Sequence, residues 1–231
     1  MMDLLARLIG AAHRARRTLM RDRWKRVLPF GEVFTDRWEK ARFLGFGEGA
    51  SIYDSAVVIG EVKVGSKSWI GPNCILDGSG GLTIGAICSI SSGVQIYSHD
   101  TVDWAVSGGI APYRQQATEI GDHVYLGPNT VVAAGSHIGK GCIVGAQSFV
   151  KGELAPYTFA AGCPAPIIVA ATEAEIVKAL ARLANPAKRK AVGEALALWS
   201  RLSMATGRLG RSAWRCSSRP RGLRWAGRHD G

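Results

Sequence analysis

The chain has 231 residues, with 29 lysines and arginines against 18 aspartates and glutamates and a formal net charge of +11. This length suits one sizeable domain, and a hydrophobic fraction of 47% excludes a chain that is disordered throughout. No run of about 18 apolar residues is present, so we expect no membrane-spanning helix. Five cysteines without a C-x-x-C pair argue against a disulfide framework or a cysteine zinc site.

The positive charge is concentrated at the two ends of the chain. Residues 1–30 carry +6 and residues 201–231 carry +7, which leaves −2 on the residues between them. Basic proteins often bind nucleic acid because lysine and arginine neutralise phosphates. A slightly acidic body argues against that function, so we expect no nucleic-acid partner.

Residues 1–47 are predicted to form a helical flank. Leu4, Leu8 and Leu19 recur at helical spacing and arginines occupy other positions over residues 4–28, which indicates a basic amphipathic helix. Two roles stay open for it: covering the end of the following domain, or contacting an anionic membrane surface. The first residues lack a cleavable signal pattern, so we expect a cytoplasmic protein, with the inner face of the membrane as the place of any peripheral contact.

A six-residue repeat runs through the next predicted domain, residues 48–169. An aliphatic residue leads each hexapeptide, and a small or apolar residue follows four positions later, as in IGDHVY and IGKGCI. The leading residues are Ile52, Val58, Val64, Ile70, Leu76, Ile84, Ile90, Ile96, Ile120, Leu126, Val132, Ile138, Val144 and Val150. A period of six fits neither an amphipathic helix nor an alternating strand. It predicts short strands, three to a coil, in coils that stack about 4.8 Å apart by parallel pairing.

Glycine and cysteine recur at two positions of the repeat. Glycine often follows the leading residue, as at Gly121 and Gly127, and we attribute it to turn angles that a Cβ atom would forbid. Cys74, Cys88 and Cys142 take the fourth position after the leading residue. That position predicts buried packing residues, and a buried thiol without a base is a poor nucleophile.

Two segments interrupt the repeat, and both carry polar residues. The shorter is DGSGG at residues 77–81, and the longer is a loop at residues 100–119 that follows His99. Loops of that length inside a compact domain are usually functional. Imidazole accepts a proton near neutral pH, so we predict that His99 is a general base, oriented by Asp77 or by Asp100.

The same two segments supply candidates for contact with an acceptor substrate, and the chain continues beyond the repeat. The candidates are Asp77, Trp104, Ser107 and Tyr113. His123 and His137 are predicted to face solvent. Residues 170–202 are predicted to form C-terminal helices, the first of them running from Thr172 to Leu183, and residues 203–231 are predicted to be a disordered basic tail.

The spacing of the repeat resembles that of the hexapeptide-repeat acyltransferases, which include galactoside and maltose acetyltransferases and the sugar O- and N-acetyltransferases of glycan synthesis. The resemblance implies an all-β fold, the left-handed parallel β-helix, whose hand the period itself does not select. It also implies a homotrimer, and a histidine base next to an extended loop, the position of His99.

The resemblance extends to a groove between subunits where members of the family bind coenzyme A. Here IVGAQSFVKGELAPYTFAAGCPAPII is similar to their closing segment. Pro166 stands where related sequences have lysine or arginine, so part of the phosphate recognition is missing or supplied elsewhere. The implied donor-binding residues are Gly145 and Ala146 in an amide-donating turn, Lys151 as the basic residue, Pro164 in the final G-x-P-A, and Pro128 and Ala134 on the preceding coils.

These features together predict an acyltransferase that moves an acetyl group from acetyl-CoA directly to a sugar hydroxyl or amine, in glycan or nucleotide-sugar metabolism. Zinc catalysis is not expected, because the γ-class carbonic anhydrases of this fold have two zinc-binding histidines five residues apart and this chain has no such pair. Two alternatives stay open. One is a non-catalytic β-helix scaffold, and the other is a serine-type O-acetyltransferase, which is disfavoured because the long helical N-terminal domain of that branch is missing.

Overall fold

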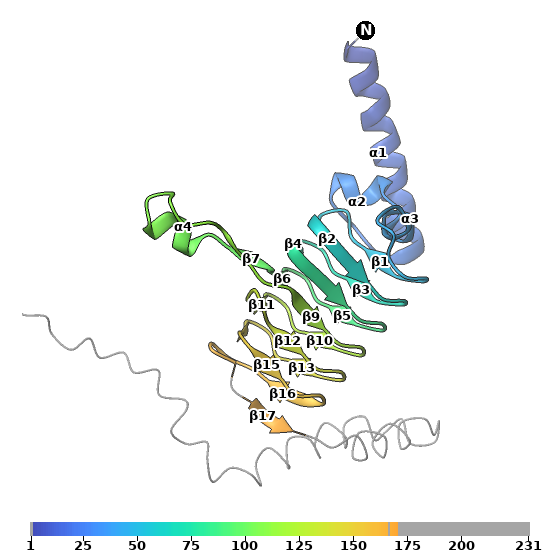
Figure 1. The fold of residues 1–231 in the computed structure, drawn as a ribbon. Coiled ribbons are helices and arrows are strands. Elements are labelled where there is room, and N and C mark those ends of the chain that lie inside the picture. The colour runs from blue at the N-terminus through green and yellow to red at the C-terminus, as the bar shows by residue number, and fades with distance from the viewer. Residues whose placement is uncertain (1, 166, 171–231) are drawn as a thin grey trace, which may run out of the picture. The chain divides into compact units, whose positions relative to one another are not determined.

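The computed structural model describes residues 2–165 and 167–170. The predicted C-terminal helices, apart from Ala170, and the predicted tail lie outside these residues. Four helices are described: α1 (Met2–Trp24), α2 (Phe30–Phe34), α3 (Arg37–Phe43) and α4 (Val102–Val106). Seventeen strands are described as well, and most of them are short (Figure 1). They are β1 (Ser51–Ile52), β2 (Val57–Val64), β3 (Trp69–Ile70), β4 (Ile75–Ile84), β5 (Ser89–Ile90), β6 (Gln95–Ile96), β7 (His99–Asp100), β8 (Arg114–Gln115), β9 (Thr118–Ile120), β10 (Tyr125–Leu126), β11 (Val131–Val132), β12 (His137–Ile138), β13 (Ile143–Val144), β14 (Phe149–Val150), β15 (Glu153–Leu154), β16 (Thr158–Ala160) and β17 (Ile167–Ala170).

The strands pair between successive coils and form three faces. On the first face β1, β3, β5, β10, β13 and β16 pair in parallel in that order, and β17 is added antiparallel to β16. The long strands β2 and β4 contribute to two faces each. Their first halves lie on the face of β6, β11 and β14, and the end of β4 pairs with β9 on the face of β12 and β15. The predicted all-β fold, a parallel β-helix, is confirmed.

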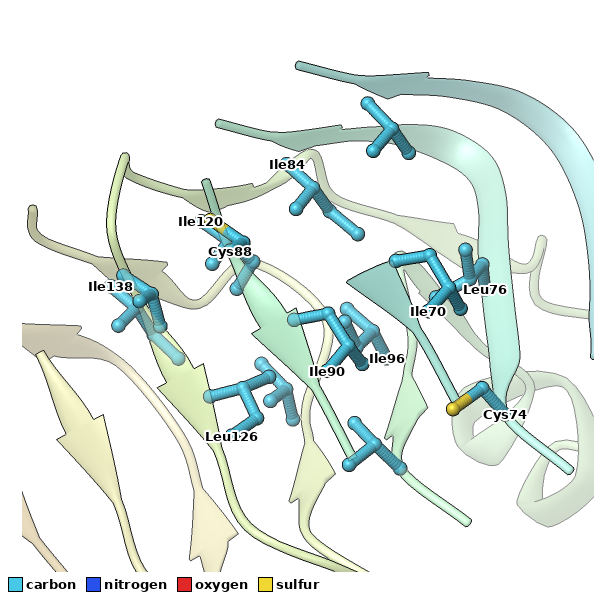
Figure 2. Packing of buried hydrophobic residues seen from close by; sticks show 14 of the residues in the cluster. Ile70, Cys74, Leu76, Ile84, Cys88, Ile90, Ile96, Ile120, Leu126 and Ile138 are labelled. Carbon is cyan, nitrogen blue, oxygen red and sulfur yellow. The ribbon is translucent and has the colours of Figure 1, made fainter. Parts of the chain in front are cut away.

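The leading residues of the hexapeptides form the core. All of them are buried except Val58, which is half-buried. In Figure 2, Ile70, Ile90 and Leu126 point inward from strands of one face toward the side chains of the other faces. Cys74, Cys88 and Cys142 are buried too, so the predicted interior position of the three thiols is confirmed.

The glycines that follow the leading residues serve a different purpose from the one predicted. A Cβ atom on Gly127 would lie 2.5 Å from the backbone nitrogen of Ala146 on the next coil, and Gly121 is similarly close to Lys140. The left-handed backbone angles occur two positions later, at residues such as His123 (φ 60°) and Asn129 (φ 57°). Our explanation by turn angles was therefore wrong: these glycines allow neighbouring coils to approach each other.

The helical flank is attached to the first coil through α2 and α3. Ala41 of α3 is buried with the core, and the Nζ atom of Lys40 donates hydrogen bonds to the carbonyls of Tyr53, Asp54 and Ala56. Of the two roles left open for the basic helix, covering the coil belongs to α3. Most residues of α1 are exposed.

The longer interruption is a hairpin that leaves the stack of coils, which we call the arm (residues 99–115). Strands β7 and β8 pair antiparallel and α4 lies between them, and the arm extends away from the coils in Figure 1. Ile90 pairs with Leu126, 36 residues later, whereas Leu126 pairs with Val144, 18 residues later. The arm thus lengthens one coil without breaking the parallel stack, which resumes at Thr118.

Candidate active site

His99 and Asp77 form a hydrogen-bonded pair where the arm leaves the coils. His99 is the first residue of β7, and Asp77 lies in β4 on the preceding coil, within the DGSGG segment. The Nδ1 atom of His99 is 2.5 Å from Oδ2 of Asp77. Asp100, the other acid predicted to orient the imidazole, instead accepts a hydrogen bond from the backbone N–H of Val102. The structure therefore places Asp77, not Asp100, against the ring.

Asp77 is held rigidly by donors from its own segment and from the next coil. Its Oδ1 atom accepts hydrogen bonds from the backbone N–H and hydroxyl of Ser79, and Oδ2 also accepts one from the backbone N–H of Ser98. Only 1% of its side chain is exposed. A carboxylate so enclosed cannot contact a substrate directly, so the structure does not support Asp77 as an acceptor-binding residue.

These contacts fix the ionisation of Asp77 and the tautomer of His99. Burial by itself raises the pKa of Asp77, but the hydrogen bonds from Ser79, Ser98 and His99 outweigh it and lower that pKa to about 2. An ionised carboxylate only accepts hydrogen bonds, so Nδ1 of His99 carries the proton. The Nε2 atom is then unprotonated in the neutral ring and available as a base.

A cleft of about 220 Å³ connects His99 with Lys151. It crosses three coils along residues that each follow a leading residue: Tyr97 after Ile96, Ala133 after Val132, and Lys151 after Val150. The backbone N–H of Tyr97 donates to the carbonyl of Val132, and that of Ala133 donates to Val150. The lining residues are Tyr97, His99, Asp100, Arg114, Gln116, Val131, Ala133, Ala134, Phe149 and Lys151.

The arm residues predicted to contact an acceptor do not line this cleft. The rings of Trp104 and Tyr113 pack edge to face on each other, with centroids 5.6 Å apart. The hydroxyl of Ser107 accepts hydrogen bonds from the backbone N–H groups of Ile110 and Ala111. These three residues stabilise the tip of the arm within their own chain.

The predicted donor-binding residues divide into two groups. Lys151 and Ala134 line the cleft, and Ala146 and Pro128 lie in exposed turns of adjacent coils. The N–H of Gly145, predicted to face the donor, instead donates to the carbonyl of Ala160 within the stack.

Pro164 is exposed in the closing segment and does not line the cleft. The segment is tied to β14, because the N–H of Phe149 donates to the carbonyl of Gly162 and the N–H of Ala165 donates to the carbonyl of Phe149. Phe149 itself lines the cleft.

Comparison with known proteins agrees with this architecture. The family model described as bacterial transferase hexapeptide (six repeats) matches residues 117–152. WbbJ of Escherichia coli K12, named as a lipopolysaccharide biosynthesis O-acetyl transferase, is 33% identical over 149 residues, which cover 60% of this chain and 69% of WbbJ. The chain belongs to the hexapeptide-repeat transferase family. It is an acyltransferase of that family.

Other relatives of this hexapeptide-repeat transferase share shorter segments or the fold. A 2,3,4,5-tetrahydropyridine-2,6-dicarboxylate N-acetyltransferase of Staphylococcus aureus is 37% identical over 83 residues, which cover 34% of this chain and 35% of the relative. A variant of AntD, an N-acyltransferase from Bacillus cereus, has been solved in complex with dTDP and coenzyme A. Its structure matches with a TM-score of 0.51 and 27% identity, over 58% of this chain and 75% of AntD.

Sequence reasoning did not single out several residues that line the cleft of this transferase. They are Tyr97, Arg114, Gln116, Val131 and Phe149. Tyr97 holds the same repeat position as Lys151, so aligning the hexapeptides by coil would have found it. Arg114 and Gln116 gave no such signal. They lie about 15 residues after His99 in the sequence, and only the antiparallel pairing of β7 with β8 brings them beside it.

His123, His137 and the three buried cysteines of the transferase do not line the cleft. His123 occupies a left-handed turn, and Nδ1 of His137 lies 3.1 Å from the carboxylate of Glu119 on a different face. Burial raises the pKa of the Cys74 thiol to about 11 and also raises those of Cys88 and Cys142. A thiol so rarely ionised is a poor nucleophile, which argues against an acyl-cysteine intermediate on any of these three residues.

Proposed function

We propose that this protein transfers an acetyl or closely related acyl group from acyl-CoA to a hydroxyl or amino group of a sugar, carried on a nucleotide or a lipid-linked glycan. The observation that carries the proposal is the Asp77–His99 pair, which opens onto a cleft that reaches Lys151. The names of two relatives support the acceptor class: one is named for O-acetyl transfer in lipopolysaccharide biosynthesis, and the other binds dTDP together with coenzyme A.

In this proposal His99 acts as the general base for direct transfer. Its Nε2 atom accepts the proton of the acceptor hydroxyl or amine as the acceptor's oxygen or nitrogen attacks the thioester carbonyl. The tetrahedral intermediate then collapses, the carbon–sulfur bond breaks, and the imidazolium returns the proton to the departing thiolate. Asp77 stabilises the imidazolium and holds the ring, and backbone N–H groups stabilise the oxyanion.

The donor is proposed to occupy the Lys151 end of the cleft. Lys151 is exposed there and positioned to neutralise a phosphate of coenzyme A. The N–H of Ala146 makes no hydrogen bond with any residue in the described part of the chain, so it is free to donate to a pantetheine amide.

We further propose that the active unit is a homotrimer in which an adjacent copy completes the cleft. Val106 and Ile110 on the arm are more than 80% exposed, which fits an arm that packs against a neighbouring copy. Sedimentation velocity on the purified protein tests the trimer, and a monomer that is fully active would contradict it.

A direct test combines donor binding with acceptor screening. Calorimetry with coenzyme A measures donor binding, and release of free thiol from acetyl-CoA is followed with panels of nucleotide sugars, amino sugars and free amino acids. We expect turnover with one sugar class. Turnover only with an amino acid such as serine would favour the serine-type alternative, and absence of coenzyme A binding would contradict the proposal.

A further inference from the structure

Helix α1 exposes a continuous apolar stripe to its surroundings. Leu4, Leu8 and Leu19 lie along one side of the helix with alanines between them, because residues three or four apart share a side. Leu5 and Ile9 widen this stripe. Between 45% and 64% of each of these five side chains is exposed, and none belongs to the core of the β-helix.

The contacts between α1 and α2 lie at one edge of this stripe and beyond it, because at 3.6 residues per turn Arg16 points between Leu5 and Ile9 and His13 points outside the stripe. The ring of His13 lies 4.9 Å from that of Phe30, and the guanidinium of Arg16 donates to the carbonyl of Val33. With 3.6 residues per turn, His13 points about 140° away from Leu8 and about 120° away from Leu19. No residue in the described part of the chain therefore covers the centre of the stripe.

The opposite side of α1 is strongly basic. The helix carries six arginines against two aspartates, a net charge of +4. Arg7, Arg14, Arg17 and Arg21 all point away from the stripe. A helix is only about 10–12 Å across with its side chains, close to the Debye length of about 8 Å at physiological ionic strength, so these charges still attract an anionic surface beneath the stripe.

We propose that α1 binds the surface of an anionic lipid bilayer through this stripe. A wide apolar side opposite a basic side is the pattern of helices that lie in the plane of a membrane surface. Among residues 2–165 and 167–170, no helix is long and apolar enough to cross a membrane. In this proposal α1 therefore lies parallel to the membrane surface and contacts the bilayer along its whole length.

Charge favours a bilayer over a second copy of α1 as the partner of the stripe. Both aspartates are already paired with arginines of the same helix, Asp3 with Arg7 and Asp22 with Arg21, at 2.9 Å. Neighbouring copies of α1 would bring +4 against +4, with no unpaired aspartate on either helix to compensate. The stripe, about 140° wide from Leu4 to Ile9 at 3.6 residues per turn, is also broader than a coiled-coil seam.

Co-sedimentation of the full chain with lipid vesicles tests this proposal without any acceptor or acyl donor, so it does not depend on the proposed reaction. The vesicles contain phosphatidylcholine with phosphatidylglycerol, or phosphatidylcholine alone, at low and high salt. Leu8→Gln removes one apolar side chain of the stripe but keeps helix propensity. Phe43→Gln is the matched control, because Phe43 is 83% exposed on α3. Arg14→Gln/Arg17→Gln tests the charge without changing the stripe.

We expect the protein to bind the anionic vesicles and to be released by salt. Leu8→Gln should weaken binding about tenfold, Arg14→Gln/Arg17→Gln by a similar factor, and Phe43→Gln not at all. If Leu8→Gln loses its helical circular dichroism, the arginine pair decides the question. The proposal is wrong if the protein stays in the supernatant, if both test variants bind as the unmodified chain does, or if Leu8→Gln reduces the size of the oligomer in sedimentation velocity.

Discussion

Two neighbouring columns of the β-helix, one inside and one outside, show how a repeat divides stability from function. Ile96, Val132 and Val150 stack inside the coils and are buried. The residues that follow them, Tyr97, Ala133 and Lys151, line the cleft. The inner column has almost one kind of residue, because every coil offers the same dry, close-packed site. The outer column has an aromatic, a small and a charged residue, so repetition of the backbone leaves the outward positions free to differ.

Loss of the proposed base should have the largest effect. It should lower activity, which depends on the outer column, and leave stability, which depends on the inner column, unchanged. We expect His99→Ala to lower kcat by about 10²–10⁴-fold, the usual contribution of a general base, with an unchanged melting temperature. Steady-state thiol release measures it. His137→Ala, an exposed histidine on another face, is the control and should keep full activity. Normal turnover by folded His99→Ala would remove His99 from the mechanism.

The inner column is tested on a single strand, β12, where His137 points outward and Ile138 inward. We expect Ile138→Ala to lower the free energy of unfolding by about 2–5 kcal/mol, because it leaves a cavity in the core. His137→Ala should lower it by less than about 1 kcal/mol, since it loses only an exposed contact with Glu119. Urea denaturation measures the free energy of unfolding of both variants. Equal losses would contradict the assignment of stability to the inward-facing residues.

Asp77 is buried like the inner column and also contacts His99 at the cleft. Its pKa is lowered to about 2, so the folded state is stabilised when this carboxylate is ionised. That stabilisation, about 2 kcal/mol, is fully present above about pH 4 and is lost as the pH falls from about 4 to about 2. Urea denaturation at several pH values should therefore show a smaller loss of stability over this range for Asp77→Asn. An identical pH dependence would show that the pair does not stabilise the fold.

The donor end of the outer column should show the smallest effect. We expect Lys151→Ala to raise the KM for acyl-CoA about tenfold at low salt, with little change in kcat, since one contact to an exposed phosphate is lost. Lys140→Ala, an exposed lysine outside the cleft, is the matched control. If both variants had the same KM, the donor would bind elsewhere.

The repeat was readable because its period has a single physical cause. A buried aliphatic residue must recur wherever a short strand turns its side chain into the coil. The leading residues of the hexapeptides, from Ile52 to Val150, therefore indicate the positions of the strands directly. The glycines that follow the leading residues were identified, but their role was predicted wrongly. Their role depends on how closely Ala146 approaches Gly127 from the next coil, and the local sequence does not contain that distance.

Only part of the candidate site could be predicted from the sequence, for a related reason. His99 stood out beside the long interruption, but Asp77 and Asp100 were equally placed in sequence to orient it. Coil stacking decided between them, because it brings β4 beside the residues that follow β6 and encloses the Asp77 carboxylate with donors from both coils. Arg114 and Gln116 reach the cleft only because β8 folds back on β7.

The six-residue period thus sufficed for the stacked coils and the buried column, and its longest interruption pointed to His99, since each of these follows from spacing along the chain. The partner of the base and the path of the cleft arise between coils, where residues about 20 positions apart or more meet, as Asp77 and His99 do. The excess positive charge shows the same division. The sequence located it at residues 1–30 and 201–231, whereas only the structure showed that the contacts of α2 with α1 leave the centre of the apolar stripe exposed.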